Sequence, residues 1–183
     1  MRPTAALVLV NLIIGAAVLV SYVWGIRQFD DPTTALWGDA PTIVKSSAVA
    51  TMPLAALGYL WVVWGHLLWQ SDFSSSKLRG RDVAWLIVGI DAIILLLSAL
   101  WMPLTVAAIQ RQSDFIRYCV FILLWIVAGA TIVAIWALAA METTAPSWSQ
   151  RLAVAGALAF AFQTVVLDGI VWVIGFNPTG GAP

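Results

Sequence analysis

The sequence predicts an all-α integral membrane protein, a bundle of five transmembrane helices. Three observations support this fold class. Of the 183 residues, 62% are apolar and only 10% are charged, against roughly 25% charged in an ordinary soluble domain. Five stretches are each long enough to cross a hydrocarbon core about 30 Å thick, which takes about 20 helical residues. They are continuously apolar, whereas the strands of a membrane barrel would alternate polar and apolar residues.

The first predicted span, 5–26, contains the run AALVLVNLIIGAAVLV, which is longer than the 7 to 15 apolar residues typical of a signal peptide. We therefore expect it to remain as a helix of the bundle. The later spans are predicted at 47–69, 83–109, 115–141 and 151–176. Because the connections between them are short, the whole chain, 1–183, is expected to form a single membrane domain.

The longest connection, 27–46, contains Pro32, Gly38 and Pro41. Proline and glycine at this density favour turns, so we expect this segment to fold back over one end of the bundle as a lid.

Charge and residue counts exclude several classes of function. Nine basic and nine acidic residues give a net charge of zero, which provides no basic surface for nucleic acid and leaves the lipid bilayer as the expected surrounding. One cysteine and one histidine cannot form a cysteine-cluster or multi-histidine metal site. No nucleophile–base pattern or phosphate loop occurs, so we expect no enzyme and no catalytic residues. Without a targeting signal, a prokaryotic inner membrane is the expected location.

Asp91 lies about eight residues into the third predicted span, roughly 12 Å below the membrane surface at 1.5 Å per residue. A carboxylate facing lipid at this depth costs about 2.5 to 3.5 kcal/mol, so we expect Asp91 to face the other helices. Ser98 and Thr105 follow at steps of seven, on the same helix face. Asp168 in the last span is expected to share a level with Asp91 and to form a second polar anchor.

Tryptophan is abundant, with eleven residues, and most of these are expected to anchor the bundle at the membrane interfaces. Trp61, Trp64 and Trp101 lie deeper and are predicted either to line a cavity or to pack as ordinary core aromatics. The predicted ligand-binding set is therefore Trp61, Trp64, Asp91, Ser98, Trp101 and Asp168.

His66 is a separate candidate. The segment GHLLW is similar to the pigment-ligating stretch of light-harvesting beta chains, and an imidazole nitrogen can bind the central metal of a tetrapyrrole axially. The alternative is a hydrogen-bonded histidine near the membrane interface.

Five spans, many tryptophans, a long first loop and the segments MPLAALGYL and SALWMPLTV together resemble the tryptophan-rich sensory protein / translocator protein (TspO/MBR) family. Leu100, Trp101 and Pro103 are similar to the family's third-helix Asn-x-Leu-Trp-x-Pro motif, with Ser98 in place of asparagine. Ala56 stands where the family has a second-helix tryptophan. The resemblance implies a five-helix bundle, often a dimer, with a cavity under the first loop for tetrapyrroles or sterol-like molecules.

These observations predict a membrane protein that binds a hydrophobic or tetrapyrrole small molecule in a cavity within the bundle, as a sensor or carrier. The sequence assigns no cofactor, and a tetrapyrrole such as haem or porphyrin is the candidate. The expected partners are a hydrophobic small molecule and a second copy of the chain or a larger membrane complex. The main alternative is a non-catalytic accessory subunit of such a complex. A proton or ion carrier that uses the two aspartates is a third interpretation.

Overall fold

The computed structural model describes residues 1–38, 40–70 and 72–176 and is an all-α bundle with one small hairpin. Five helices are long and apolar enough to cross a membrane: Pro3–Ile26, Thr42–Trp69, Ala84–Arg111, Asp114–Ala140 and Ser147–Gly175. All five overlap the predicted spans. The second and fifth begin five and four residues earlier than predicted, because Thr42 and Ser147 directly follow Pro41 and Pro146, which precede the first helical residue without interrupting it.

The helices and strands occur in the following order: α1 Pro3–Ile26, α2 Pro32–Trp37, α3 Thr42–Leu60, η1 Trp61–Gln70, η2 Phe73–Ser75, β1 Lys77–Leu78, β2 Arg81–Asp82, α4 Ala84–Arg111, α5 Asp114–Ala140, α6 Ser147–Ala161, η3 Phe162–Trp172 and α7 Val173–Gly175. The segments η1 and η3 are π-helical and continue α3 and α6. Continuous α-helices were expected there, since the sequence pattern alone does not reveal π-helical hydrogen bonding.

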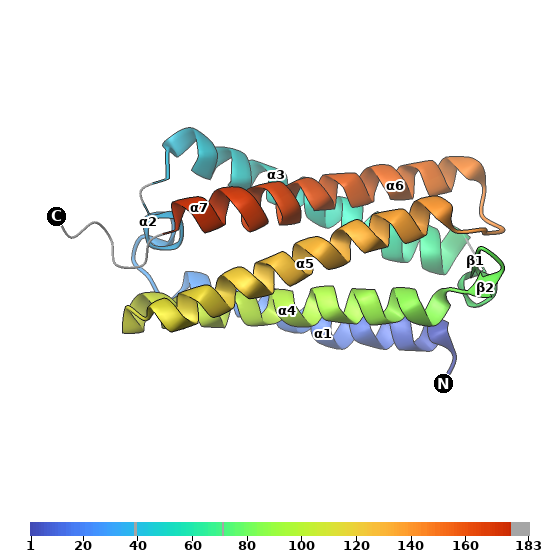
Figure 1. Cartoon of the computed structure of the whole chain (residues 1–183), viewed down its shortest axis with the longest axis horizontal. Helices are drawn as coiled ribbons and strands as arrows, with labels where there is room; N and C mark the ends of the chain where they lie inside the picture. The colour runs from blue at the N-terminus through green and yellow to red at the C-terminus, as the bar shows by residue number, and fades with distance from the viewer. Residues whose placement is uncertain (39, 71, 177–183) are drawn as a thin grey trace.

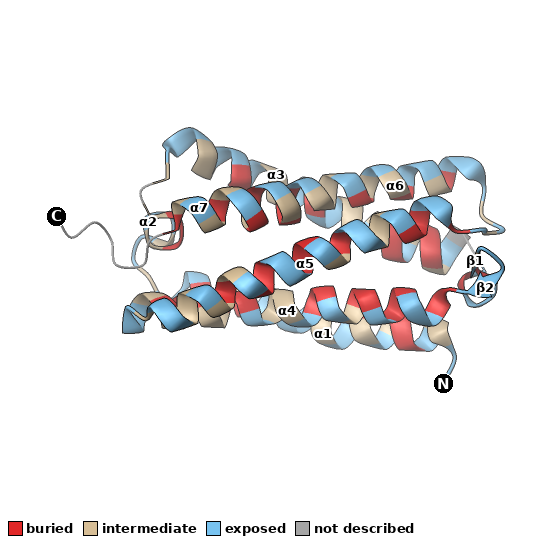
Figure 2. Ribbon diagram, viewed as in Figure 1, coloured by how far each residue is buried: buried red, intermediate tan, exposed pale blue. Residues whose placement is uncertain are grey.

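The long helices form two pairs, one parallel and one antiparallel, with α5 between them (Figure 1). One pair is α1 with α4, and the other is α3 and η1 with α6 and η3. Helix α5 packs against α4 on one side and against α6 and η3 on the other. Buried residues lie on the helix faces that turn toward one another, while the outward faces are largely exposed and apolar (Figure 2). This distribution is the one expected for a bundle whose outer surface meets hydrocarbon.

The first loop folds back over one end of the bundle and is held by α2. Asp31 caps α2 by accepting a hydrogen bond from the backbone N–H of Thr34 at 3.1 Å, and hydrogen bonding by Thr34 lowers the pKa of this carboxyl. The indole N–H of Trp172 donates to the carbonyl oxygen of Leu36 at 2.9 Å, so α2 is tied to the last helix.

An aromatic cluster fills the bundle beneath α2. Trp172 stacks on Phe176, with ring centroids 4.1 Å apart, and meets Trp101 and Phe121 edge-on. Tyr22 of α1 packs against the other side of Trp101. Trp172 is only 2% exposed, so this residue is a core aromatic rather than the interface anchor that its position near the end of a span predicts.

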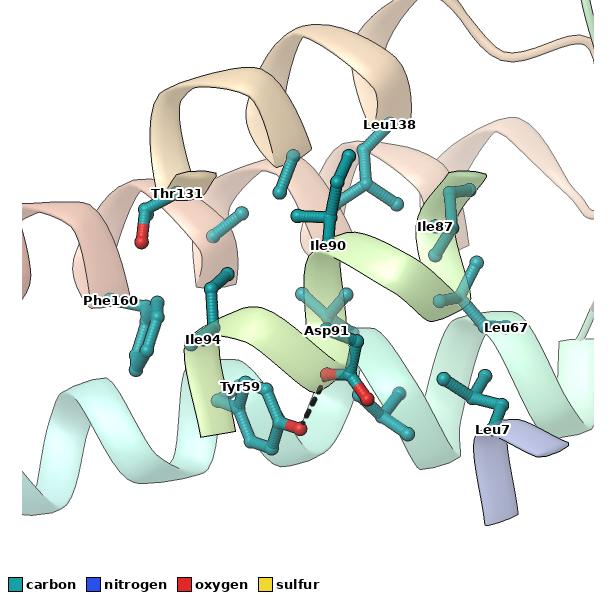
Figure 3. A pocket seen from close by; sticks show the side chains of 14 residues that line it. Leu7, Tyr59, Leu67, Ile87, Ile90, Asp91, Ile94, Thr131, Leu138 and Phe160 are labelled. Carbon is teal, nitrogen blue, oxygen red and sulfur yellow. Dashed lines mark hydrogen bonds between the residues drawn. The ribbon is translucent and has the colours of Figure 1, made fainter. Parts of the chain in front are cut away.

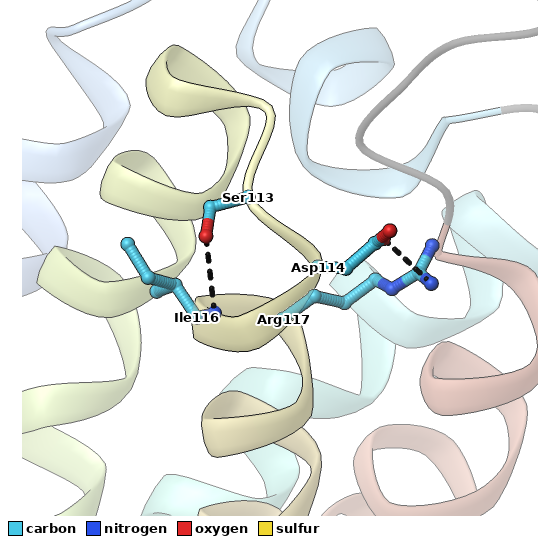
Figure 4. A network of polar contacts seen from close by, with 4 residues as sticks. All are labelled: Ser113, Asp114, Ile116 and Arg117. Atoms are coloured by element: carbon cyan, nitrogen blue, oxygen red, sulfur yellow. Dashed lines mark hydrogen bonds and ion pairs between the residues drawn. The ribbon is translucent and has the colours of Figure 1, made fainter.

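The turns at the two ends of the bundle are set by local interactions, a helix cap at one end and a glycine in a hairpin at the other. Ser113 caps α5 by accepting from the N–H of Ile116, and Asp114 pairs with Arg117 one turn later at 2.8 Å (Figure 4). At the opposite end the β1–β2 hairpin turns through Gly80, whose φ of +77° is a conformation that glycine adopts without strain.

Helices α3 and α6 approach each other closely where Gly58 faces Gly156. A methyl group added at Gly156 would lie 2.7 Å from the carbonyl oxygen of Gly58. The missing side chains therefore let the two backbones touch, as small residues do at helix crossings in membranes.

Gly156→Ala is expected to lower the free energy of unfolding by about 1 to 3 kcal/mol, because the new methyl group forces α3 and α6 apart. Gly129→Ala is the matched control: nothing lies within 4 Å of a methyl group there, so helix propensity should raise stability by up to about 1 kcal/mol. Unfolding of both variants in detergent, followed by circular dichroism, tests this. Equal stabilities would contradict the close crossing.

Candidate functional site

Asp91 lies inside the bundle, 7% exposed, in a closed ring of hydrogen bonds with Asn11 of α1 and Tyr59 of α3. The amide nitrogen of Asn11 donates to Asp91 Oδ2 at 2.8 Å. The hydroxyl oxygen of Tyr59 lies 2.7 Å from Asp91 Oδ1 and 2.6 Å from the amide oxygen of Asn11. Three helices that are distant in sequence therefore meet at one carboxyl group.

The spacing of residues on each helix explains how these side chains meet. On α4, the buried residues Ile87 and Ile94 lie four and three positions from Asp91 and share its face. On α1, Asn11 follows the fully buried Leu7 by one turn, and its amide also donates to the Leu7 carbonyl at 3.0 Å. The same periodicity that buries the apolar faces thus carries the polar groups inward.

A cavity of about 50 Å³ lies beside the ring (Figure 3). Asp91, Tyr59 and Thr131 are the polar residues in its wall. The other lining residues are apolar and come from α1, η1, α4, α5 and α6. They are Leu7, Val62, Val63, Leu67, Ile87, Ile90, Ile94, Ala134, Leu138, Ala157 and Phe160. An apolar chamber with a few converging polar groups is the usual form of a small-molecule site.

Of the six residues predicted to bind a ligand, the structure places only Asp91 at this cavity. Ser98 is half-buried and lies two turns further along α4. Trp64 is 38% exposed on the outside of η1. Trp61 lies over Gly65 and packs against Trp148, with ring centroids 6.1 Å apart. Trp61 and Trp64 therefore do not line the cavity beside Asp91.

Trp101 belongs to the aromatic cluster beneath α2, between Tyr22 and Trp172. It is 5% exposed and its indole nitrogen has no hydrogen-bond partner among the described residues. The family resemblance implies a cavity under the first loop with Trp101 in its wall. In this bundle, aromatic rings occupy that region, and the cavity beside Asp91 lies further toward the β1–β2 end, where it is lined by Leu7 and Ile87.

Asp168 belongs to a different polar network from Asp91. It accepts from the side-chain amide of Gln163 at 2.9 Å, and Gln163 in turn accepts from the hydroxyl of Thr51 at 2.8 Å. Asp91 lies seven residues from the β1–β2 end of its span and Asp168 seven from the opposite end of its own, each about 10 Å deep at 1.5 Å per residue. The two acids therefore lie at different levels, and the predicted shared site does not form.

His66 is fully buried, and its Nδ1 lies 3.0 Å from the hydroxyl oxygen of Ser149 on α6. Its Nε2 has no hydrogen-bond partner among the described residues. The cavity is lined by the neighbouring Val62, Val63 and Leu67 and not by His66. A tetrapyrrole needs an open face in front of the ligating nitrogen, so the structure favours the hydrogen-bonded histidine over the axial ligand.

A tetrapyrrole does not fit the residues of this cavity. Pockets for drug-sized ligands measure about 300 to 1,000 Å³, and an apolar cavity of about 150 Å³ holds a molecule the size of benzene. The cavity beside Asp91, at about 50 Å³, has room for a few non-hydrogen atoms.

Tyr59 and Thr131 are the polar cavity residues that sequence reasoning did not assign. Tyr59 directly follows Gly58 and lies two residues before the π-helical segment η1, and this local pattern does not indicate that it meets α4. Thr131 donates to the Val127 carbonyl at 2.9 Å, a bond within its own helix. The sequence indicated Tyr59 only indirectly, because the buried carboxyl group of Asp91 needs a hydrogen-bond donor from another helix.

No protein-family model, curated protein or solved structure matches this chain. The function proposed below therefore rests on the geometry of the ring and the cavity.

Tyr59→Phe is expected to lower the free energy of unfolding by about 1 to 3 kcal/mol, because it leaves the buried oxygens of Asp91 and Asn11 without their shared partner. Tyr118→Phe is the control, since Tyr118 is 55% exposed on α5. Thermal unfolding of the two variants in the same detergent compares them. A Tyr59→Phe protein as stable as the Tyr118→Phe protein would show that the ring does not hold the helices together.

Proposed function

We propose that this protein binds a small hydrophobic molecule in the cavity beside Asp91, as a membrane-embedded sensor or carrier. The observation that carries the proposal is the largely aliphatic wall of the cavity, contributed by helices from both pairs. A ligand placed there would contact α1 and α4 on one side and α3, η1 and α6 on the other. A bound ligand would therefore change how the two helix pairs pack against each other.

The size and polarity of the cavity define the class of ligand. The hydroxyl of Thr131 already donates within α5, and both oxygens of Asp91 already face the ring partners. A ligand would therefore meet mainly methyl and methylene groups, which favours a compact, uncharged, apolar molecule. Dioxygen, xenon and very short hydrocarbons have this chemistry.

The resemblance to the TspO/MBR family supports a ligand-binding bundle, through Leu100, Trp101, Pro103 and the five-span layout. It also favours a tetrapyrrole, for which the cavity would have to enlarge. We place the protein in a prokaryotic inner membrane, and a homodimer or a larger membrane complex remains the predicted assembly. The proposal assigns no catalytic role to any residue.

Xenon is the probe that tests the cavity. Xenon-129 NMR of the detergent-solubilised protein is expected to show a saturable shift, which Ala134→Leu should abolish because the larger side chain fills the space between α5 and Tyr59. Ala139→Leu, an exposed position on the same helix, is the control and should leave the shift unchanged.

A saturable xenon shift that survives Ala134→Leu would contradict binding in this cavity. The alternative, that the ligand is a tetrapyrrole, is tested by the quenching of tryptophan fluorescence on addition of a porphyrin. Saturable quenching that is reduced in Trp101→Phe would favour a tetrapyrrole beneath α2 over a small ligand beside Asp91.

A further inference from the structure

We propose that the carboxyl group of Asp91 carries a proton, and that this proton closes the hydrogen-bond ring joining α1, α3 and α4. The inference concerns the ring itself and does not depend on what the neighbouring cavity binds. It makes Asp91 a proton-binding site inside the bundle.

The first argument is a count of hydrogens. The ring contains three short contacts: Asn11 with Asp91 Oδ2, Tyr59 with the Asn11 amide oxygen, and Tyr59 with Asp91 Oδ1. A fourth contact joins Asn11 to the Leu7 carbonyl. The amide of Asn11 supplies two hydrogens and the hydroxyl of Tyr59 supplies one. One contact therefore lacks a hydrogen unless Asp91 supplies it.

The contact without a hydrogen would be one of the two at Tyr59. Its hydroxyl oxygen lies 2.6 Å from one acceptor and 2.7 Å from the other, and both distances are those of full O–H···O hydrogen bonds. A single hydrogen shared by two acceptors would not hold both this close. With a proton on Asp91 Oδ1, the acid donates to Tyr59 and Tyr59 donates to Asn11, so each contact has its own hydrogen.

Reversing the amide of Asn11 does not remove the need for this proton. The amide nitrogen would then donate to Tyr59, and the amide oxygen would face Asp91 Oδ2 at 2.8 Å and the Leu7 carbonyl at 3.0 Å. Two oxygens 2.8 Å apart again require a hydrogen from Asp91, and the contact with Leu7 would remain unsatisfied. The orientation in which Asn11 donates to Leu7 satisfies more groups, and both orientations need a protonated acid.

The second argument is the absence of a counter-charge. Among the described residues that line the cavity around Asp91, Tyr59 of α3 is the other titratable group, and neither a lysine nor an arginine lies in the wall. Helix α1 contributes Asn11 and Leu7, α5 contributes Thr131, and η1 and α6 contribute apolar side chains. His66 on η1 is engaged with Ser149 instead. An ionised carboxylate there would be buried without a cation, which is costly.

The proton has a mechanical consequence, because Tyr59 comes from one helix pair and its two partners from the other. With Asp91 protonated, Tyr59 makes two hydrogen bonds across the gap between the pairs. Loss of the proton leaves one hydrogen for two acceptors and places a charge in the apolar wall. Deprotonation is therefore expected to weaken the connection between α3 and the α1–α4 pair.

Infrared spectroscopy of the protein in an ester-free detergent tests the proposal directly. A protonated carboxylic acid has a carbonyl stretching band separate from the bands of carboxylates. We expect the difference between wild type and Asp91→Asn at neutral pH to show the loss of one acid band. Asp114→Asn is the control, because Asp114 is paired with Arg117 at the surface, and there the difference should show the loss of a carboxylate band.

Two further variants keep the test decisive. Asp168→Asn separates a contribution from the second buried network, and the acid band assigned to Asp91 should persist in that variant. Tyr59→Phe removes the acceptor of the Asp91 proton, so the acid band should move to higher frequency. Asp91→Asn is expected to fold, since an asparagine amide can donate to Tyr59 and accept from Asn11 in the same positions.

The proposal is overturned if Asp91→Asn removes a carboxylate band at neutral pH, or if Tyr59→Phe leaves the acid band unmoved. Raising the pH should convert the Asp91 band to a carboxylate band and lower the unfolding temperature of the wild type, but not that of Asp91→Asn. An unfolding temperature with the same pH dependence in both proteins would contradict the role of the proton in holding α3.

Discussion

A carboxyl group buried among apolar helices has to find its hydrogen-bond partners inside the protein, and this requirement organises the bundle around Asp91. Neither partner lies on its own helix, because Asn11 comes from α1 and Tyr59 from α3. Satisfying one side chain therefore fixes the relative heights of three helices. A purely apolar interface in lipid would specify these heights less strictly, since hydrocarbon tails offer helices contacts of the same kind.

The two halves of the bundle are stabilised in different ways. Beneath α2, large rings fill the space between helices, and Trp172 both stacks on Phe176 and holds the loop through the Leu36 carbonyl. Toward the β1–β2 end, aliphatic side chains leave room for a cavity, and specificity comes from polar contacts such as the Asp91 ring and the His66–Ser149 pair. The half filled by aromatic rings and the half with the cavity lie along the same helices.

The sequence was sufficient for the five helices and for the inward orientation of Asp91, because hydropathy and the cost of a charge in lipid are local properties. It was not sufficient for the partners of Asp91, since these depend on which helices become neighbours. Asp168 was misplaced for a related reason: equal depths measured from opposite ends do not give equal levels. The position of a tryptophan along its span also did not predict that Trp101 packs against other aromatic rings or that Trp64 faces outward. The π-helical turns of η1 and η3 change the direction in which the side chains of later residues point, and no local sequence pattern predicts these turns.

The contact between Gly58 and Gly156 has a geometric consequence for how α3 can move. Where two backbones touch, they act as a fulcrum, and a rod that tilts about a fulcrum moves least at that point. Tyr59 is the next residue, so rocking of α3 would displace its hydroxyl little while swinging the Thr42 end and the far end of η1 in opposite directions. Such rocking would move both ends of the helix formed by α3 and η1 while Tyr59 keeps its contacts with Asp91 and Asn11.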